Sequence, residues 1–292
     1  MKAMEPEDTR AFPEPPVPPY DFGGEGPVIH LAHANGFPPG TYRPLAEALT
    51  DRYHVLGLPS RPLWPGSRPE SAPDWHPLAD DLIAGLDGLG LRGIVGVGHS
   101  LGGVLTLWAA IRRPDLFRAI VLIDPVMMPP GWLWLLRLMR WLGLGHRQPL
   151  VQGALRRRRV WPSRQACYEH YAGRSIFATW PEESLRAYVE AGTRERADGQ
   201  VELVYPPAWE AHIFATAPTD VWRAVPRLRT PTLVLRGAHS RTFPAASQAR
   251  MARLVPQTRF VVIPEAGHLV PMERPRETAQ AIRVFLESLE SL

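Results

Sequence analysis

The chain has 292 residues, of which 45% are hydrophobic and 21% charged, and this composition excludes a wholly disordered protein. Its net charge is +4 and is carried almost wholly by arginine, because Lys2 is the only lysine. So small an excess over this length does not indicate a nucleic-acid binder. The single cysteine, Cys167, excludes a disulfide within the chain and a cysteine-based zinc site.

The N-terminal residues contain no apolar segment of the kind that a secretory signal peptide needs, so we expect a cytoplasmic protein. Residues 5–19 alternate acids with prolines, and proline neither continues a helix nor donates to a sheet. We therefore predict an extended arm over residues 1–20. The longest apolar stretch, residues 131–144, is interrupted by Arg137 and Arg140 and is too short to cross a bilayer.

From residue 21 onwards, short β-type runs alternate with helix-like stretches, which predicts an α/β fold with a mostly parallel sheet covered by helices. The expected strands are 27–32, 53–58, 93–97, 119–123, 232–235 and 260–263. The expected helices are 42–50, 78–89, 101–113, 245–254 and 275–289.

This alternation stops after Asp124 and resumes near Thr230. The residues between are rich in tryptophan and arginine, have helical patterns and show no convincing strand; Ser163, for example, is placed as the N-cap of a helix. We expect a core over residues 21–125 and 226–292 and a helical cap inserted at 126–225. Such a cap would cover the carboxyl ends of the strands, where α/β sheets bind ligands.

The segment Gly98-His99-Ser100-Leu101-Gly102 follows a predicted strand and leads directly into a predicted helix. A side chain on so sharp a turn is held in a strained backbone conformation, and the residues two positions away must be small, as these two glycines are. The start of the helix also presents backbone N–H groups beside Ser100, where negative charge would develop in an acyl transfer. The segment predicts a nucleophilic serine.

With these pieces the chain resembles the α/β-hydrolase superfamily over nearly its whole length. The resemblance rests on HANGFPPG after the first expected strand, GHSLGG at the turn, LIDP after the next strand and EAGHLVPMERP after the last. It implies an eight-stranded, mostly parallel sheet, a serine nucleophile, a histidine base and an acid. That chemistry needs no cofactor, and no spacing of histidines suggests a metal site.

By the resemblance, His268 in EAGHLVPMERP is the base. The family most often carries its acid after the strand at 232–235, but there the turn reads GAHS and ends at Ser240 without a carboxylate. Asp124, directly after the strand at 119–123, is the substitute that the resemblance suggests, and Glu265 is the other candidate. Aspartate also favours turns, so Asp124 could serve only the turn before Pro125.

The resemblance further implies an oxyanion hole made of two backbone N–H groups, one of them from Leu101. The second comes from HANGFP. Aligning its Asn-Gly-Phe-Pro part on the family's pattern gives Phe37, whereas aligning its His-Ala part gives Asn35. We expect Phe37, because Gly36 and Pro38 then match the usual flanking residues.

The expected activity is hydrolysis of a carboxylic ester with a hydrophobic acyl or aryl group, through an acyl-enzyme. Two alternatives stay open: a C–C bond hydrolase with the same triad, and a catalytically silent member of the fold that binds a hydrophobic ligand. The apolar stretch at 131–144 favours either packing over the cleft or weak contact with a membrane surface. The four arginines at 156–159 predict a solvated face or a site for an anionic group.

Overall fold

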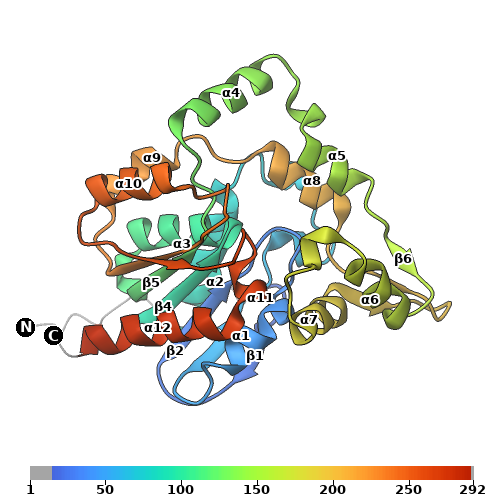
Figure 1. The fold of residues 1–292 in the computed structure, drawn as a ribbon, viewed down its shortest axis with the longest axis horizontal. Helices are drawn as coiled ribbons and strands as arrows, with labels where there is room; N and C mark the ends of the chain where they lie inside the picture. The colour runs from blue at the N-terminus through green and yellow to red at the C-terminus, as the bar shows by residue number, and fades with distance from the viewer. Residues whose placement is uncertain (1–14, 291–292) are drawn as a thin grey trace, which may run out of the picture.

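The computed structural model describes residues 15–290, and within them the main sheet has seven strands (Figure 1). Their order is β1-β3-β2-β4-β5-β9-β10, and all neighbours are parallel except β1, which runs antiparallel to β3. This confirms the mostly parallel sheet. The strands are β1 Tyr20–Gly23, β2 Val28–Ala32, β3 His54–Gly57, β4 Ile94–His99, β5 Phe117–Ile123, β9 Thr232–Gly237 and β10 Arg259–Ile263.

Helices cover both faces of this sheet, because alternate residues of each strand point to opposite sides and both sides are apolar. In β5, Val121 packs into the core under α1 and α12, whereas Ile120 and Leu122 pack into the core under α2, α3 and α10. The helices outside residues 126–225 are α1 Arg43–Glu47, α2 His76–Gly88, α3 Leu101–Arg112, α10 Ala245–Leu254, α11 Val270–Glu273 and α12 Pro275–Glu290, with 3-10 turns η1 Pro39–Tyr42, η2 Arg61–Leu63, η3 Pro69–Ser71, η4 Pro114–Leu116 and η7 Val225–Arg227.

The expectation of eight strands was wrong for the described part of the chain. The edge strand β1 begins at Tyr20, the last residue of the expected arm, and residues 15–19 ahead of it include four prolines, which have no N–H to give to a neighbouring strand. Residues 1–14 of the expected arm lie outside the described residues.

Residues 126–225, which we call the insertion, separate β5 from β9 and contain strands as well as helices. A small antiparallel sheet with the order β6-β8-β7 corrects the expectation that this region has no strand. These strands have only two or three residues each, too few to show a period of two in the sequence. The elements are α4 Pro130–Trp141, η5 Gly145–Arg147, α5 Pro149–Leu155, β6 Val160–Trp161, α6 Arg164–Ala172, η6 Ser175–Phe177, α7 Glu182–Gly192, β7 Thr193–Glu195, β8 Val201–Leu203, α8 Pro207–Ala215 and α9 Val221–Ala224.

A local sequence signal nevertheless located the start of one helix in the insertion. Ser163 is the N-cap of α6, where its hydroxyl oxygen accepts a hydrogen bond from the N–H of Ala166 at 3.1 Å. Gly192 is the last residue of α7. The turn between β7 and β8 contains Asp198-Gly199, a pair that favours tight hairpins and could have revealed these strands.

The turn from β4 into α3 requires glycine because backbones meet there. A Cβ on Gly102 would lie 2.0 Å from the carbonyl oxygen of Ala32 at the end of β2, and a Cβ on Gly98 would lie 2.3 Å from the carbonyl oxygen of Gly102. Neither contact can be relieved by moving a side chain. The two glycines thus let α3 begin directly against the end of the sheet.

We predict that Gly102→Ala destabilises the fold by about 2–3 kcal/mol, which lowers Tm by about 3–5 °C, because the backbone of β2 must give way. Thermal unfolding followed by circular dichroism measures this. The control is Gly153→Ala in α5, where a Cβ meets no atom within 4 Å and should stabilise the helix by about 0.5–1 kcal/mol. Equal Tm values for the two variants would contradict the close approach of the α3 backbone at Gly102 to the end of β2.

Candidate functional site

Ser100 stands on the turn between β4 and α3 with φ 55° and ψ −111°. A positive φ is uncommon outside glycine and costs free energy, so the surrounding structure must hold it. Its N–H donates to the carbonyl oxygen of Ile123 at 2.9 Å, which fixes the turn to the end of β5. The side chain is thereby presented at the carboxyl edge of the sheet, as the sequence predicted.

The structure brings His268 and Asp124 to this serine. The hydroxyl of Ser100 lies 2.9 Å from Nε2 of His268, and Nδ1 of His268 lies 2.6 Å from Oδ2 of Asp124. With the proton on Nδ1, the imidazole donates to the carboxylate and accepts from the hydroxyl. Parallel pairing of His99 with Ile123 sets the ends of β4 and β5 side by side, which is why residues 24 positions apart in sequence meet here.

Asp124 is completely buried, and its carboxylate is held by three donors. Besides His268, the hydroxyl of Ser240 donates to Oδ2 at 2.5 Å and the N–H of Gly237 donates to Oδ1 at 3.3 Å. Ser240 therefore occupies the turn where the family usually carries its acid, and there it binds the displaced carboxylate. Glu265 lies elsewhere: its side chain is 82% exposed and pairs with Arg274 at 3.3 Å.

His99 links two loops of the site. Its Nδ1 accepts from the hydroxyl of Tyr42 at 2.7 Å, and its Nε2 donates to the carbonyl oxygen of His268 at 3.0 Å. The Tyr42 oxygen in turn accepts from the N–H of Ala34 at 2.8 Å. Burial lowers the pKa of His99 to about 3, with a further contribution from His268, so the ring stays neutral and the hydrogen bonds keep these directions.

The backbone N–H of Phe37, the expected second oxyanion donor, is already engaged. It donates to the carbonyl oxygen of Ala34 at 3.2 Å within a tight turn, while the Phe37 ring packs against Tyr188. Within residues 15–290, the N–H groups of Leu101 and Asn35 have no hydrogen-bond acceptor, and both residues lie on the wall of the same cavity as Ser100. The other alignment, which gave Asn35, fits this geometry better.

The side chain of Asn35 explains how its backbone is held. Its Nδ2 donates to the carbonyl oxygen of Glu210 in α8 at 3.0 Å, and its Oδ1 accepts from the hydroxyl of Tyr205 at 3.0 Å. The loop that follows β2 is thus tied to the insertion on one side. Because these partners lie 170 and 175 positions away along the chain, no local signal could have identified them.

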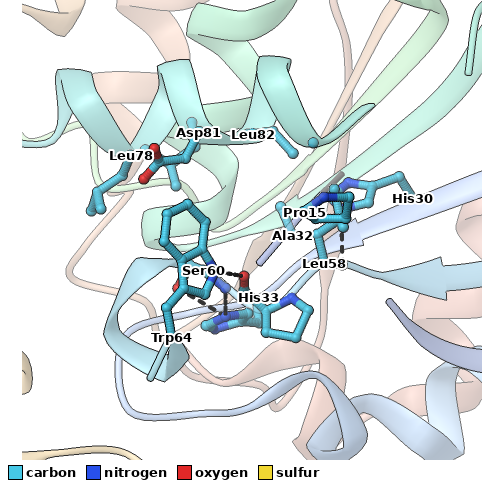
Figure 2. A pocket seen from close by; sticks show the side chains of 13 residues that line it. Pro15, His30, Ala32, His33, Leu58, Ser60, Trp64, Leu78, Asp81 and Leu82 are labelled. Carbon is cyan, nitrogen blue, oxygen red and sulfur yellow. Dashed lines mark hydrogen bonds between the residues drawn. The ribbon is translucent and has the colours of Figure 1, made fainter. Parts of the chain in front are cut away.

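The same loop is supported from behind by a histidine that the sequence left without a role. Figure 2 shows His33 beside Ser60 in a small cavity of about 30 Å³. Its Nδ1 donates to the carbonyl oxygen of Ala34 at 2.9 Å, and its Nε2 accepts from the N–H of Ser60 at 3.0 Å. Burial lowers the pKa of His33 to about 4, so this ring also stays neutral and connects the loop after β2 to Ser60 by hydrogen bonds.

Ser100 and His268 open onto a cavity of about 1250 Å³ between the sheet and the insertion. One wall is apolar and is formed largely by α4 and α8, and another carries arginines of the insertion. Arg157 is held there by Glu210 at 2.7 Å, whereas Arg156 and Arg158 are exposed. Among residues 15–290, no group of three or more His, Cys, Asp or Glu side chains is arranged to hold a metal ion.

This arrangement matches a known family. A model of the alpha/beta hydrolase family covers residues 31–281. The chain belongs to this family. Over 268 residues it is 28% identical to 2-(acetamidomethylene)succinate hydrolase from Mesorhizobium japonicum, a match that covers 91% of this chain and 90% of that protein. It is also 26% identical over 271 residues to pimeloyl-(acyl-carrier protein) methyl ester esterase from Xanthomonas axonopodis, covering 92% and 98%.

Solved structures of alpha/beta hydrolases agree. The crystal structure of E-2-(acetamidomethylene)succinate hydrolase superposes with a TM-score of 0.76 at 26% identity, covering 92% of this chain and 94% of that one. An esterase from Thermogutta terrifontis superposes with a TM-score of 0.64 at 27% identity, covering 93% of both chains. These relatives are hydrolases whose names give different substrates, so they show the fold and the broad class of reaction.

In this alpha/beta hydrolase, a carboxylate that the sequence analysis missed holds the loop around His268. Glu273 is buried, and its two oxygens accept from the N–H groups of Gly267 at 2.9 Å and Leu269 at 3.0 Å, one on each side of the histidine. The hydroxyl of Thr179 in the insertion donates to the same carboxylate at 3.2 Å. The position of the histidine loop is thereby coupled to the insertion.

We predict that Glu273→Gln destabilises this hydrolase by about 1–3 kcal/mol, because the amide NH₂ faces one of two N–H groups that need an acceptor. Thermal unfolding should show the loss as a lower Tm. Glu265→Gln, in the same loop but largely exposed, is the matched control and should change stability by less than about 0.5 kcal/mol. A Glu273→Gln variant as stable as this control would contradict the clamp.

Proposed function

We propose that this chain is a serine hydrolase that cleaves carboxylic esters through Ser100, His268 and Asp124. The observation that carries the proposal is the continuous hydrogen-bonded chain from the Ser100 hydroxyl through the imidazole to a fully buried carboxylate, at the wall of a large cavity. Neutral imidazole takes up a proton readily near neutral pH, and a carboxylate behind it stabilises the imidazolium that forms.

The reaction proceeds in two halves. His268 accepts the proton of Ser100 as the serine oxygen attacks the ester carbonyl, and the tetrahedral intermediate then collapses as His268 gives that proton to the leaving alcohol. Water enters, loses a proton to His268 and attacks the acyl-enzyme. Collapse of the second intermediate releases the acid, and the proton returns from His268 to the Ser100 oxygen. Asp124 keeps the imidazole in the tautomer that faces the serine.

The oxyanion of each intermediate is bound, in this proposal, by the N–H groups of Leu101 and Asn35. Both are free of other acceptors within residues 15–290, and Leu101 is at the N-terminus of α3, where the helix dipole also favours negative charge. Phe37, expected from the sequence, instead contributes its ring to the packing of the loop. One donor of this kind is worth on the order of 10²–10³ in turnover.

The cavity supports a hydrophobic acyl or aryl group in the substrate. Leu135, Met139 and Phe214 on its wall give such a group an apolar surface. A second candidate, cleavage of a C–C bond in an anionic substrate, is favoured by the exposed Arg156 and Arg158 on another wall of the cavity and by the succinate in the name of one relative. Comparing the rate of hydrolysis of aryl esters with the rate of C–C cleavage of anionic substrates distinguishes these two functions.

We predict that a fluorophosphonate probe labels the protein rapidly and that Ser100→Ala abolishes labelling, because the probe reports an activated serine. Asp124→Asn should slow it by on the order of 10³–10⁴-fold. Asparagine tolerates the positive φ of 43° at this position, so the fold should persist. Ester hydrolysis should fall in parallel. A wild type that resists labelling would favour the silent binding protein.

The same assay contains a test of the acid. Ser240 lies 2.5 Å from the Asp124 carboxylate, so Ser240→Asp in the Asp124→Asn background puts a carboxylate within reach of His268. We expect this double variant to recover part of the lost rate. Labelling that stays at the wild-type rate in Asp124→Asn would remove Asp124 from the proposal.

We further predict the position of the oxyanion in a phosphonate adduct of Ser100. Its oxygen should lie about 2.7–3.1 Å from the backbone nitrogens of Leu101 and Asn35. A crystal structure of the adduct measures both distances directly. If the oxygen instead contacted the nitrogen of Phe37, the turn at Ala34 would have to open and the assignment of Asn35 would be wrong.

A further inference from the structure

Helix α4 of the insertion exposes large apolar side chains to solvent that do not pack against the rest of the protein. It projects away from the main sheet at the top of Figure 1, and Leu133 is its only buried residue. Trp134 is 71% exposed and Trp141 is 82% exposed. Contiguous exposed apolar surface of this kind marks an interaction site.

One stripe of α4 is anchored to the body of the protein by polar contacts. Arg137 donates to the hydroxyl and the carbonyl oxygen of Thr219 at 3.0 and 2.7 Å. Arg140 donates to the carbonyl oxygens of Ala215 and Ala217, and burial lowers its pKa. Positions three and four apart share a helix face, so both arginines point inward together with Leu133.

This anchoring decides where the other side chains go. With the arginine stripe turned inward, Leu135 and Met139 on a second face line the large cavity. The third face, which carries Trp134, Leu138 and Trp141, is left outside, and none of these three lines the cavity. The outer face is therefore apolar because the polar face of the helix is used for attachment.

The net positive charge of the segment that contains α4 indicates what binds to the outer face of this helix. Residues 125–168 contain eight arginines and no aspartate, glutamate or lysine. Within residues 15–290, the exposed Arg147, Arg156, Arg158 and Arg159 form no ion pair, whereas the inner Arg157 pairs with Glu210. An apolar face with tryptophans, in a segment of the chain with an excess of arginine, fits an anionic lipid surface.

A second copy of the chain fits less well. A symmetric dimer through α4 would place each cationic patch against itself, and like charges in contact oppose association. Contact through a membrane-spanning helix is not proposed, since none of the helices in residues 15–290 is long and apolar enough to cross a bilayer. The remaining geometry is a helix that lies in the plane of the interface.

We propose that the outer face of α4 docks on an anionic lipid surface, with Trp134, Leu138 and Trp141 in the headgroup region and the exposed arginines of this segment against lipid phosphates. These are Arg147, Arg156, Arg158 and Arg159. Docking does not depend on the proposed function, because it requires no turnover.

The test is flotation of the full chain with vesicles. We expect binding to phosphatidylcholine vesicles that contain about 30% phosphatidylglycerol, at least about tenfold weaker binding to pure phosphatidylcholine, and a decrease as salt screens the charges. Trp134→Ala combined with Trp141→Ala should weaken binding by about tenfold or more. Arg147→Gln combined with Arg159→Gln should weaken it several-fold on the anionic vesicles alone.

The control variant is Val284→Ala on α12, whose side chain is 54% exposed and which should bind as the wild type does. The tryptophan variant should keep the wild-type Tm and its hydrolysis of a short soluble ester, since neither tryptophan lines the cavity. Wild-type binding by the tryptophan variant would overturn the proposal, as would equal binding to neutral and anionic vesicles. Sedimentation that showed a dimer lost in this variant, without vesicle binding, would identify a second copy as the occupant instead.

Discussion

The close approach of α3 to the end of β2 is the constraint on which the site depends. Gly98 and Gly102 remove the side chains that would separate these backbones, and the chain can then turn from strand to helix without a loop. Ser100 consequently takes a positive φ and leaves the sheet edge with its hydroxyl exposed to the cavity. The same turn leaves the Leu101 N–H without an intrahelical acceptor. One turn of the backbone therefore positions both the Ser100 hydroxyl and a free N–H donor at the cavity.

Buried polar groups hold the other loops against this turn. Tyr42 and His99 form a relay from the N–H of Ala34 to the carbonyl oxygen of His268, and Glu273 binds the backbone on both sides of that histidine. Each group is neutral or fully paired, which is what burial requires of polar atoms. Because each pins a backbone group, the loops are positioned with little dependence on flexible side chains.

The arginines of the insertion have two roles, attachment of α4 and exposure to solvent, which the amino-acid composition alone does not distinguish. These arginines act inward as well as outward: Arg137 and Arg140 bind backbone carbonyls, while Arg156 and Arg158 are exposed at the wall of the cavity. Since a guanidinium can satisfy several acceptors at once, these two inward arginines help Leu133 and Leu136 to attach a helix that buries little apolar surface. The tryptophans are then free to face outward.

The sequence by itself determined the parallel sheet and the turn at Ser100, because both depend on periodicity or on residues adjacent in the chain. His268 and Asp124 were expected from the resemblance to the family, which left Glu265 as a second candidate for the acid. Only the tertiary structure decided that Asn35 rather than Phe37 has a free N–H, that Ser240 and Glu273 bind other parts of the site, that the insertion contains a small sheet, and which way α4 faces. These depend on the pairing of strands and on partners up to about 175 positions apart, and no local pattern records which distant groups will meet.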